Sequence, residues 1–317
     1  MDITIERAIK GFRLYNEAAG KSKKTTVWYE SNLKLFNGWL ETQLNHKPLI
    51  SEVTADELRT FLTQKRTGID ENNHGQETSE NSKTLSARTV LGFYSSLSAF
   101  FNWSIREEFL LKSPTENVAR PKVPRFLPDP FSEQEIRALI LACKKLTDRN
   151  SLRMAAMVLF LLDSGVRVGE LLNLRLSNLE LDQGRAKVMG KGAKERYVYF
   201  GKATKRALWR YISLSRPDPV LNVDNLFLTF DGRPLPQRQF AHLLSRLGEN
   251  AGVAKVHPHR FRRTAAVQFL RNGGNIFALQ KLLGHETLEM VRRYVELASD
   301  DVAEAHQKAS PVDGWRL

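Results

Sequence analysis

The most informative part of the chain is residues 257–294, which read HPHRFRRTAAVQFLRNGGNIFALQKLLGHETLEMVRRY. Apolar residues recur there at helical spacing, which predicts helices over 259–272, 275–283 and 288–297. His285 and Tyr294 are nine residues apart, and nine steps of about 100° along one helix would place them on opposite faces. The two side chains can converge only if the chain breaks between them. Gly284 and the polar pair Glu286-Thr287 supply that break, so we expect His285 at a turn and Tyr294 on the next helix.

His259 and Arg262 stand at positions i and i+3 of the first predicted helix, so they share one face. Histidine is the side chain best able to exchange a proton near neutral pH. Arginine presents a planar fork of donors that fits a phosphate group. His257 and His259 could suggest a metal pair, but no cysteine or clear carboxylate cluster completes a tetrahedral set, so no metal and no other cofactor are expected.

Upstream, residues 164–171 read SGVRVGEL and follow a predicted helix over 150–164. Arg167 comes directly after an apolar helix and a glycine, where an exposed ion pair would be unusual, so we interpret it as a second phosphate ligand. Glu170 lies three residues further on and would share its face if the segment is helical. We interpret Glu170 as a supporting carboxylate that orients a cationic or imidazole group, the alternative being an ordinary local ion pair.

Residues 178–200 change character, because apolar and polar residues alternate in short runs on both sides of Gly190-Lys191-Gly192. This pattern predicts a small antiparallel sheet. Lys191 on a flexible turn could carry its ammonium group to a leaving oxygen as a general acid, although glycines also flank polar residues in ordinary hairpins. Lys194 is close enough to be confused with it. Five residues separate Gly184 from Gly190 and no Ser or Thr follows Lys191, so this is not a nucleotide-binding P-loop.

The first part of the chain predicts a bundle of about four helices, over 3–18, 25–42, a segment opened by the capping box Thr54–Glu57, and 86–108. An aromatic stripe on the last of these is interpreted as core. Residues 67–83 are polar and predict an exposed loop. Residues 119–130 form a basic, proline-rich linker that either lies along DNA or is a solvated hinge. We therefore expect a helical domain over 1–118 and a mainly α domain with one small antiparallel sheet over 131–317.

Charge is distributed unevenly. Residues 1–120 hold 16 basic and 15 acidic residues, whereas residues 121–317 hold 32 basic and 20 acidic ones, which places nearly all of the net charge of +13 in the second part. Such a surplus points to nucleic acid as the partner. The single cysteine, Cys143, cannot form an internal disulfide, which fits a reducing cytoplasm. No signal peptide or stretch of membrane length is recognisable, so a soluble cytoplasmic protein is expected.

Taken together, the SGVRVGE segment, Gly190-Lys191-Gly192, His259-x-x-Arg262, Leu283-Gly284-His285 and Tyr294 occur in the order and spacing of the tyrosine recombinases, or phage integrase family. The chain resembles the short Xer-like and mobile-element members, strongly over 130–297 and loosely before that. The resemblance implies a two-domain DNA clamp in which Tyr294 is the nucleophile. The other catalytic residues that it implies are Arg167, Lys191, His259, Arg262 and His285, with Glu170 supporting them.

The resemblance further implies a site-specific recombinase that cuts and rejoins double-stranded DNA through a 3′-phosphotyrosine, as a tetramer on two core sites, with accessory proteins in some cases. Further basic residues are candidate DNA contacts: Arg120, Lys122, Arg125, Lys194, Arg260, Arg263, Arg292 and Arg293. Arg263 stands where relatives often have histidine. Larger integrases carry an arm-binding domain before the bundle, and here we expect binding to a simple core site without distant arm sites. Chromosome-dimer resolution, transposition and phage integration all stay open. The rival functions are strand relaxation of the type IB topoisomerase kind and an inactive DNA-binding descendant.

Overall fold

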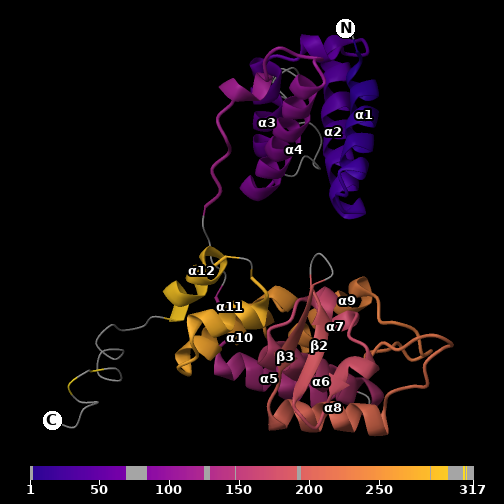
Figure 1. The fold of residues 1–317 in the computed structure, drawn as a ribbon, viewed down its shortest axis with the longest axis vertical. Helices are drawn as coiled ribbons and strands as arrows, with labels where there is room; N and C mark the ends of the chain where they lie inside the picture. Colours follow the sequence, from indigo (N-terminus) through magenta and orange to yellow (C-terminus); the bar gives the residue numbers. More distant parts are fainter. Residues whose placement is uncertain are drawn as a thin grey trace. The chain divides into compact units, whose positions relative to one another are not determined.

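The computed structural model describes residues 3–68, 84–124, 129–146, 148–190, 194–285, 287–298, 310 and 312. The chain forms two compact units, residues 1–126 and 127–317 (Figure 1). The division between them falls within the basic, proline-rich segment, whose described residues form neither helix nor strand. In the ranges just given, no helix is both long and apolar enough to cross a membrane.

The first unit is a bundle of four helices: α1 (Ile5–Ala18), α2 (Lys23–Leu44), α3 (Ala55–Thr67) and α4 (Ala87–Arg106). The predicted capping box is present, since the Thr54 N–H donates to Glu57 Oε2 at 2.8 Å. The aromatic stripe of α4 is core, with Phe100 and Phe101 fully buried, as predicted. Gly68 ends α3 with a φ of +74°, and the predicted loop lies outside the described residues from 69 onward.

The second unit contains more helices and one sheet. Its helices are α5 (Glu133–Lys144), α6 (Asp148–Ser164), α7 (Val168–Leu172), α8 (Lys202–Leu214), α9 (Gln237–Ala251), α10 (Pro258–Arg271), α11 (Ile276–Leu283) and α12 (Glu289–Ala298). α6 is central and packs against α5, α8 and α10. The predicted fold class, mainly α with a small antiparallel sheet, is confirmed.

The sheet has three antiparallel strands in the order β1 (Leu179–Glu180), β2 (Arg185–Met189) and β3 (Glu195–Tyr199). The β2–β3 register pairs Arg185 with Tyr199 and Met189 with Glu195. Alternation gives β3 an inner face with Arg196 largely buried and Val198 fully buried, while Glu195, Tyr197 and Tyr199 are exposed. The strands therefore bring one arginine of the hairpin toward the helices.

Candidate active site

Arg167 and Glu170 lie where α6 gives way to α7. Gly165 adopts a φ of +62°, which reverses the chain after α6 and leaves Arg167 as the residue that precedes α7. The Arg167 N–H donates to Glu170 Oε2 at 2.8 Å, and its Nη1 donates to Oε1 at 3.1 Å. The short helix thus places the two side chains together, and the predicted contact between Glu170 and a cation is present.

The second cation on Glu170 is Arg196, which sequence reasoning missed. Its Nη1 and Nη2 donate to the two oxygens of Glu170 at 2.8 and 2.9 Å, and its Nε donates to the Leu282 carbonyl at 3.0 Å. Burial is the largest influence on the pKa of Glu170 and acts to raise it. Hydrogen bonds from Arg196 and the Arg167 N–H, with the charges of both arginines, outweigh burial and lower the pKa below its ordinary value. Glu170 is therefore a buried carboxylate held ionised by two arginines.

Among the predicted catalytic residues that the structure describes, Arg262 on α10 is the most deeply buried, at 4% exposure. It donates to the carbonyls of Gly165 at 2.8 Å and Leu283 at 2.7 Å, and to His285 Nε2 at 2.9 Å. Burial, followed by the neighbouring charge of Arg167, lowers the pKa of Arg262 to about 10. The guanidinium is still cationic at pH 7, and its orientation is fixed by three acceptors.

His285 lies at a turn, as predicted. α11 ends at Leu283, Gly284 follows with a φ of +64°, and α12 begins only at Glu289. Because Nε2 of His285 accepts from Arg262, the neutral ring carries its proton on Nδ1, which is buried without a hydrogen-bond partner among the described residues. Burial, then the charges of Arg262 and the other arginines, lowers the pKa of His285 to about 4. The ring is therefore uncharged at neutral pH.

Tyr294 and His259 are the remaining predicted catalytic residues that the structure describes. The Tyr294 ring is half-buried on α12 and stacks on the His285 ring, with centroids 6.1 Å apart and planes 17° from parallel. It packs against a small core shared by α10, α11 and α12. His259 is exposed on α10, one turn before Arg262; partial burial and the charges of Arg262, Arg263 and Arg167 lower its pKa. A neutral His259 can accept a proton at pH 7.

A cleft of about 580 Å³ opens beside Arg167 and His285. Its lining includes four cationic side chains and one carboxylate: Arg167, Gly190, Lys194, Glu195, Arg196, Lys281, Gly284, His285 and Met290. Lys191 lies outside the described residues, but the flanking Gly190 and Lys194 border this cleft and are paired, because the Gly190 N–H donates to the Lys194 carbonyl at 2.8 Å. Lys281 is a second cleft residue that sequence reasoning missed, since nothing in its local pattern distinguishes it from other helix-terminal lysines. The cleft has the charge and size to receive a phosphodiester.

The predicted DNA contacts differ among themselves. Arg120, Lys122, Lys194 and Arg292 are exposed, and Arg263 is half-buried. Arg125 and the side chain of Arg293 lie outside the described residues. The Arg260 guanidinium already has partners within the protein, because it bonds to both oxygens of Glu135 at 2.8 Å, donates to the Ala254 carbonyl at 2.8 Å and stacks on Phe131 at 4.0 Å. Arg260 thus holds α10 to α5, and its contact with DNA stays a prediction.

Comparisons with known proteins agree with this geometry. Residues 130–300 match the phage integrase family. Tyrosine recombinase XerC of Staphylococcus carnosus is 31% identical over 291 residues, which is 92% of each chain, and tyrosine recombinase XerD of Staphylococcus aureus is 32% identical over 296 residues, covering 92% of this chain and 94% of the relative. The solved Tn1549 transposon integrase, in complex with circular intermediate DNA, covers 97% of this chain and 99% of its own at 17% identity, with a TM-score of 0.74, and so shares the fold.

The chain therefore belongs to the phage integrase family. It is a tyrosine-type site-specific recombinase, as the sequence predicted, and neither rival function finds support in the comparisons.

Proposed function

We propose that the chain cuts and rejoins DNA strands with Tyr294 as the nucleophile. The observation that carries this proposal is the position of His285, whose ring bonds to Arg262 through Nε2 and stacks on Tyr294. One neutral ring thus joins the most buried cation of the site to the candidate nucleophile. A phosphate bound by Arg262 would lie within reach of the same cluster.

The chemical step is a transesterification that needs no external energy. Tyr294 Oη forms a bond to phosphorus, and the bond from phosphorus to the 5′ oxygen breaks. The phenol proton passes to His259, which is neutral because its pKa is lowered. Lys191 gives a proton to the departing 5′ oxygen. Religation runs the same steps backward when a 5′-hydroxyl of another strand attacks the 3′-phosphotyrosine.

Arg167 and Arg262 would stabilise the charge that develops on the phosphate oxygens. Each is oriented before DNA arrives, Arg167 by Glu170 and Arg262 by two backbone carbonyls. Preorganised donors of this kind contribute strongly, since removing a single one in other enzymes slows catalysis by about 10² to 10³. The unpartnered Nδ1–H of His285 is a further donor that a phosphate oxygen could satisfy.

The test uses a nicked suicide duplex bearing the core site, which is first obtained by selecting bound duplexes from a randomised pool. Wild type and Tyr294→Phe are incubated with it in chelator, denatured and resolved on a gel. Phenylalanine keeps the ring that stacks on His285 and removes only the nucleophile. A covalent protein–DNA band with wild type alone is expected. A band that persists in Tyr294→Phe would show that another residue attacks the phosphate.

We further propose that the partner is double-stranded DNA gripped by both units, and that four copies act on two sites, with accessory proteins as additional partners.

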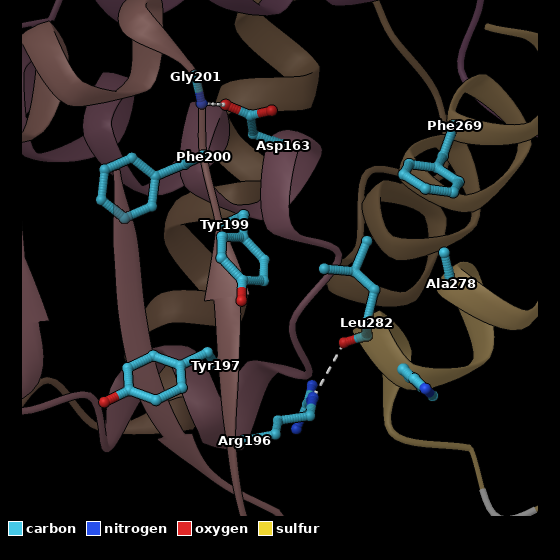
Figure 2. A pocket seen from close by; sticks show the side chains of 10 residues that line it. Asp163, Arg196, Tyr197, Tyr199, Phe200, Gly201, Phe269, Ala278 and Leu282 are labelled. Carbon is cyan, nitrogen blue, oxygen red and sulfur yellow. Dashed lines mark hydrogen bonds between the residues drawn. The ribbon is translucent and has the colours of Figure 1, made fainter. Parts of the chain in front are cut away.

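A second cavity, of about 760 Å³, offers a place for contact between copies. Its lining includes Tyr197 and Tyr199 of β3 on one side and Phe269, Ala278 and Leu282 of α10 and α11 on the other (Figure 2). We assign to this apolar cavity the C-terminal segment, residues 299–317, of a neighbouring protomer. Truncation after Ala298 should then abolish tetramer assembly on DNA, and unchanged assembly would refute the assignment.

A further inference from the structure

Arg196 connects three parts of the second unit through one side chain. It belongs to β3, its Nε donates to the Leu282 carbonyl at the end of α11 (Figure 2), and its fork holds both oxygens of Glu170 in α7. The side chain is only 14% exposed. A bidentate arginine–carboxylate pair with this geometry fixes both direction and distance, which a single point charge does not.

Arg196 also lies directly against the turn that presents His285. A Cβ atom added to Gly284 would be 3.1 Å from Nε and 3.2 Å from Cδ of Arg196. The side chain therefore lies against the glycine, next to His285, and its outer edge lines the cleft that also contains Arg167. Three of its five N–H donors already bond within the protein. These contacts indicate that Arg196 supports the structure of the site.

The β2–β3 hairpin makes few hydrogen bonds or ion pairs with the helices that carry the catalytic groups. Its other side-chain pairs stay within the sheet, namely Arg185 with Glu180 and Lys187 with Glu195. Among the residues that the structure describes, only Arg196 joins the hairpin to α7 or α11 by a hydrogen bond or ion pair. The turn end of the hairpin, at Gly190 and Lys194, borders the same cleft.

We propose that Arg196 is a positioning residue that holds the turn end of the β2–β3 hairpin against α7 and α11, so that the acid carried by this turn meets the leaving oxygen of a phosphate bound at Arg167. This inference rests on the proposed function, in which Lys191 protonates the 5′ oxygen. Arg196 acts through the hairpin and does not itself touch the reacting atoms.

The test compares two suicide duplexes, one with the normal 5′ bridging oxygen and one with sulfur in its place. A thiol has a pKa of about 8.5, far below that of an alcohol, so a thiolate departs without a general acid. Single-turnover cleavage rates are measured for wild type, Arg196→Lys, Arg196→Gln and Lys191→Ala. The ratio of sulfur to oxygen rates is taken for each variant, because a partly unfolded preparation lowers both rates equally and leaves the ratio unchanged.

We expect Arg196→Lys and Arg196→Gln to cleave the oxygen duplex on the order of tenfold to a hundredfold more slowly, the scale of loss for a group misplaced by about 1 Å. Cleavage of the sulfur duplex should fall less than about threefold, as it should in Lys191→Ala. The control Arg185→Lys, which disturbs an arginine–carboxylate pair in the same sheet away from α7 and α11, should match wild type on both duplexes.

Equal losses on the two duplexes in the Arg196 variants would overturn the inference, because the effect of Arg196 would then not depend on protonation of the leaving oxygen. A different result addresses the proposed function. If sulfur restores the Arg196 variants but not Lys191→Ala, the hairpin carries the acid at another residue, and Arg196 still positions it.

Discussion

Replacing Gly284 with alanine tests how tightly the turn before His285 is constrained. Gly284 ends α11 with φ +64° and ψ +50°, a left-handed conformation. An alanine held there costs about 1–2 kcal/mol relative to glycine. The same cost applies to Gly252, which ends α9 in the same unit with a φ of +67°.

The two glycines differ in what surrounds them. A Cβ at Gly252 would have no atom within 4 Å, whereas a Cβ at Gly284 would be 3.1–3.3 Å from three atoms of the Arg196 side chain. Arg196 cannot retreat freely because its fork is bonded to Glu170 and Leu282. Weakening one or two of those hydrogen bonds adds about 1–2 kcal/mol.

We therefore expect Gly284→Ala to lower the free energy of unfolding of the second unit by about 2–4 kcal/mol and Gly252→Ala by about 1–2 kcal/mol. Urea denaturation of the two variants and wild type measures the difference. Cleavage of the suicide duplex should fall at least about tenfold in Gly284→Ala and stay near wild type in Gly252→Ala. Equal destabilisation, or full activity in Gly284→Ala, would refute the claim that Arg196 packs rigidly against this turn.

Three further substitutions test other contacts. Glu170→Gln should lower the free energy of unfolding by about 3 kcal/mol, because it leaves two arginines without their buried counter-charge; denaturation measures this, and a loss below about 1 kcal/mol would argue against a tightly held pair. Arg260→Ala should lower the free energy of unfolding by about 2 kcal/mol, because the Glu135 contacts are lost. DNA affinity in a gel-shift titration should stay within about threefold of wild type. Weaker binding with unchanged stability would instead support a DNA contact at Arg260. For His285, the folded-state pKa of about 4 lies below its ordinary value of 6.5, so the unfolded chain binds more protons between these values. Stability should therefore fall as the pH drops from 6.5 to 4, less steeply in His285→Gln, and parallel curves for the two proteins would show that the pKa is not lowered.

The helices around His285 could be predicted because residues close in the sequence determine where each helix ends. Gly284 is followed by polar residues, and a left-handed residue there ends α11. The break explains how His285 and Tyr294 can stack although they are nine residues apart. In contrast, the short helix α7 was not predicted as a separate element, since five residues carry too little periodicity to distinguish it from a turn.

Arg196 and Arg260 could not be assigned from sequence, because their partners are distant in the chain. Glu170 precedes Arg196 by 26 positions and Glu135 precedes Arg260 by 125. Arg260 stands beside His259, so its neighbourhood suggested DNA contact, yet a helix turns side chains one residue apart by about 100° and directs this one toward α5. A signal for Arg196 existed in β3, where an arginine alternates with exposed residues on the face of a buried valine. An arginine on an inner face requires a buried acceptor, and Glu170 was the nearest candidate in the motif.

The charges of the site explain why it should attract a phosphate, because its cations are not all neutralised by carboxylates of the protein. Arg167 and Arg196 bond to the single carboxylate of Glu170, whereas the acceptors of Arg262 among the described residues are two carbonyls and a neutral imidazole. The described groups therefore hold more positive than negative charge, and this excess acts with burial to lower the pKa of both Arg262 and His285. A phosphodiester in the cleft would offset this excess of positive charge. Glu170 thus serves to fix the direction of two arginines without neutralising the site, which is the arrangement that binding and cleaving a DNA strand requires.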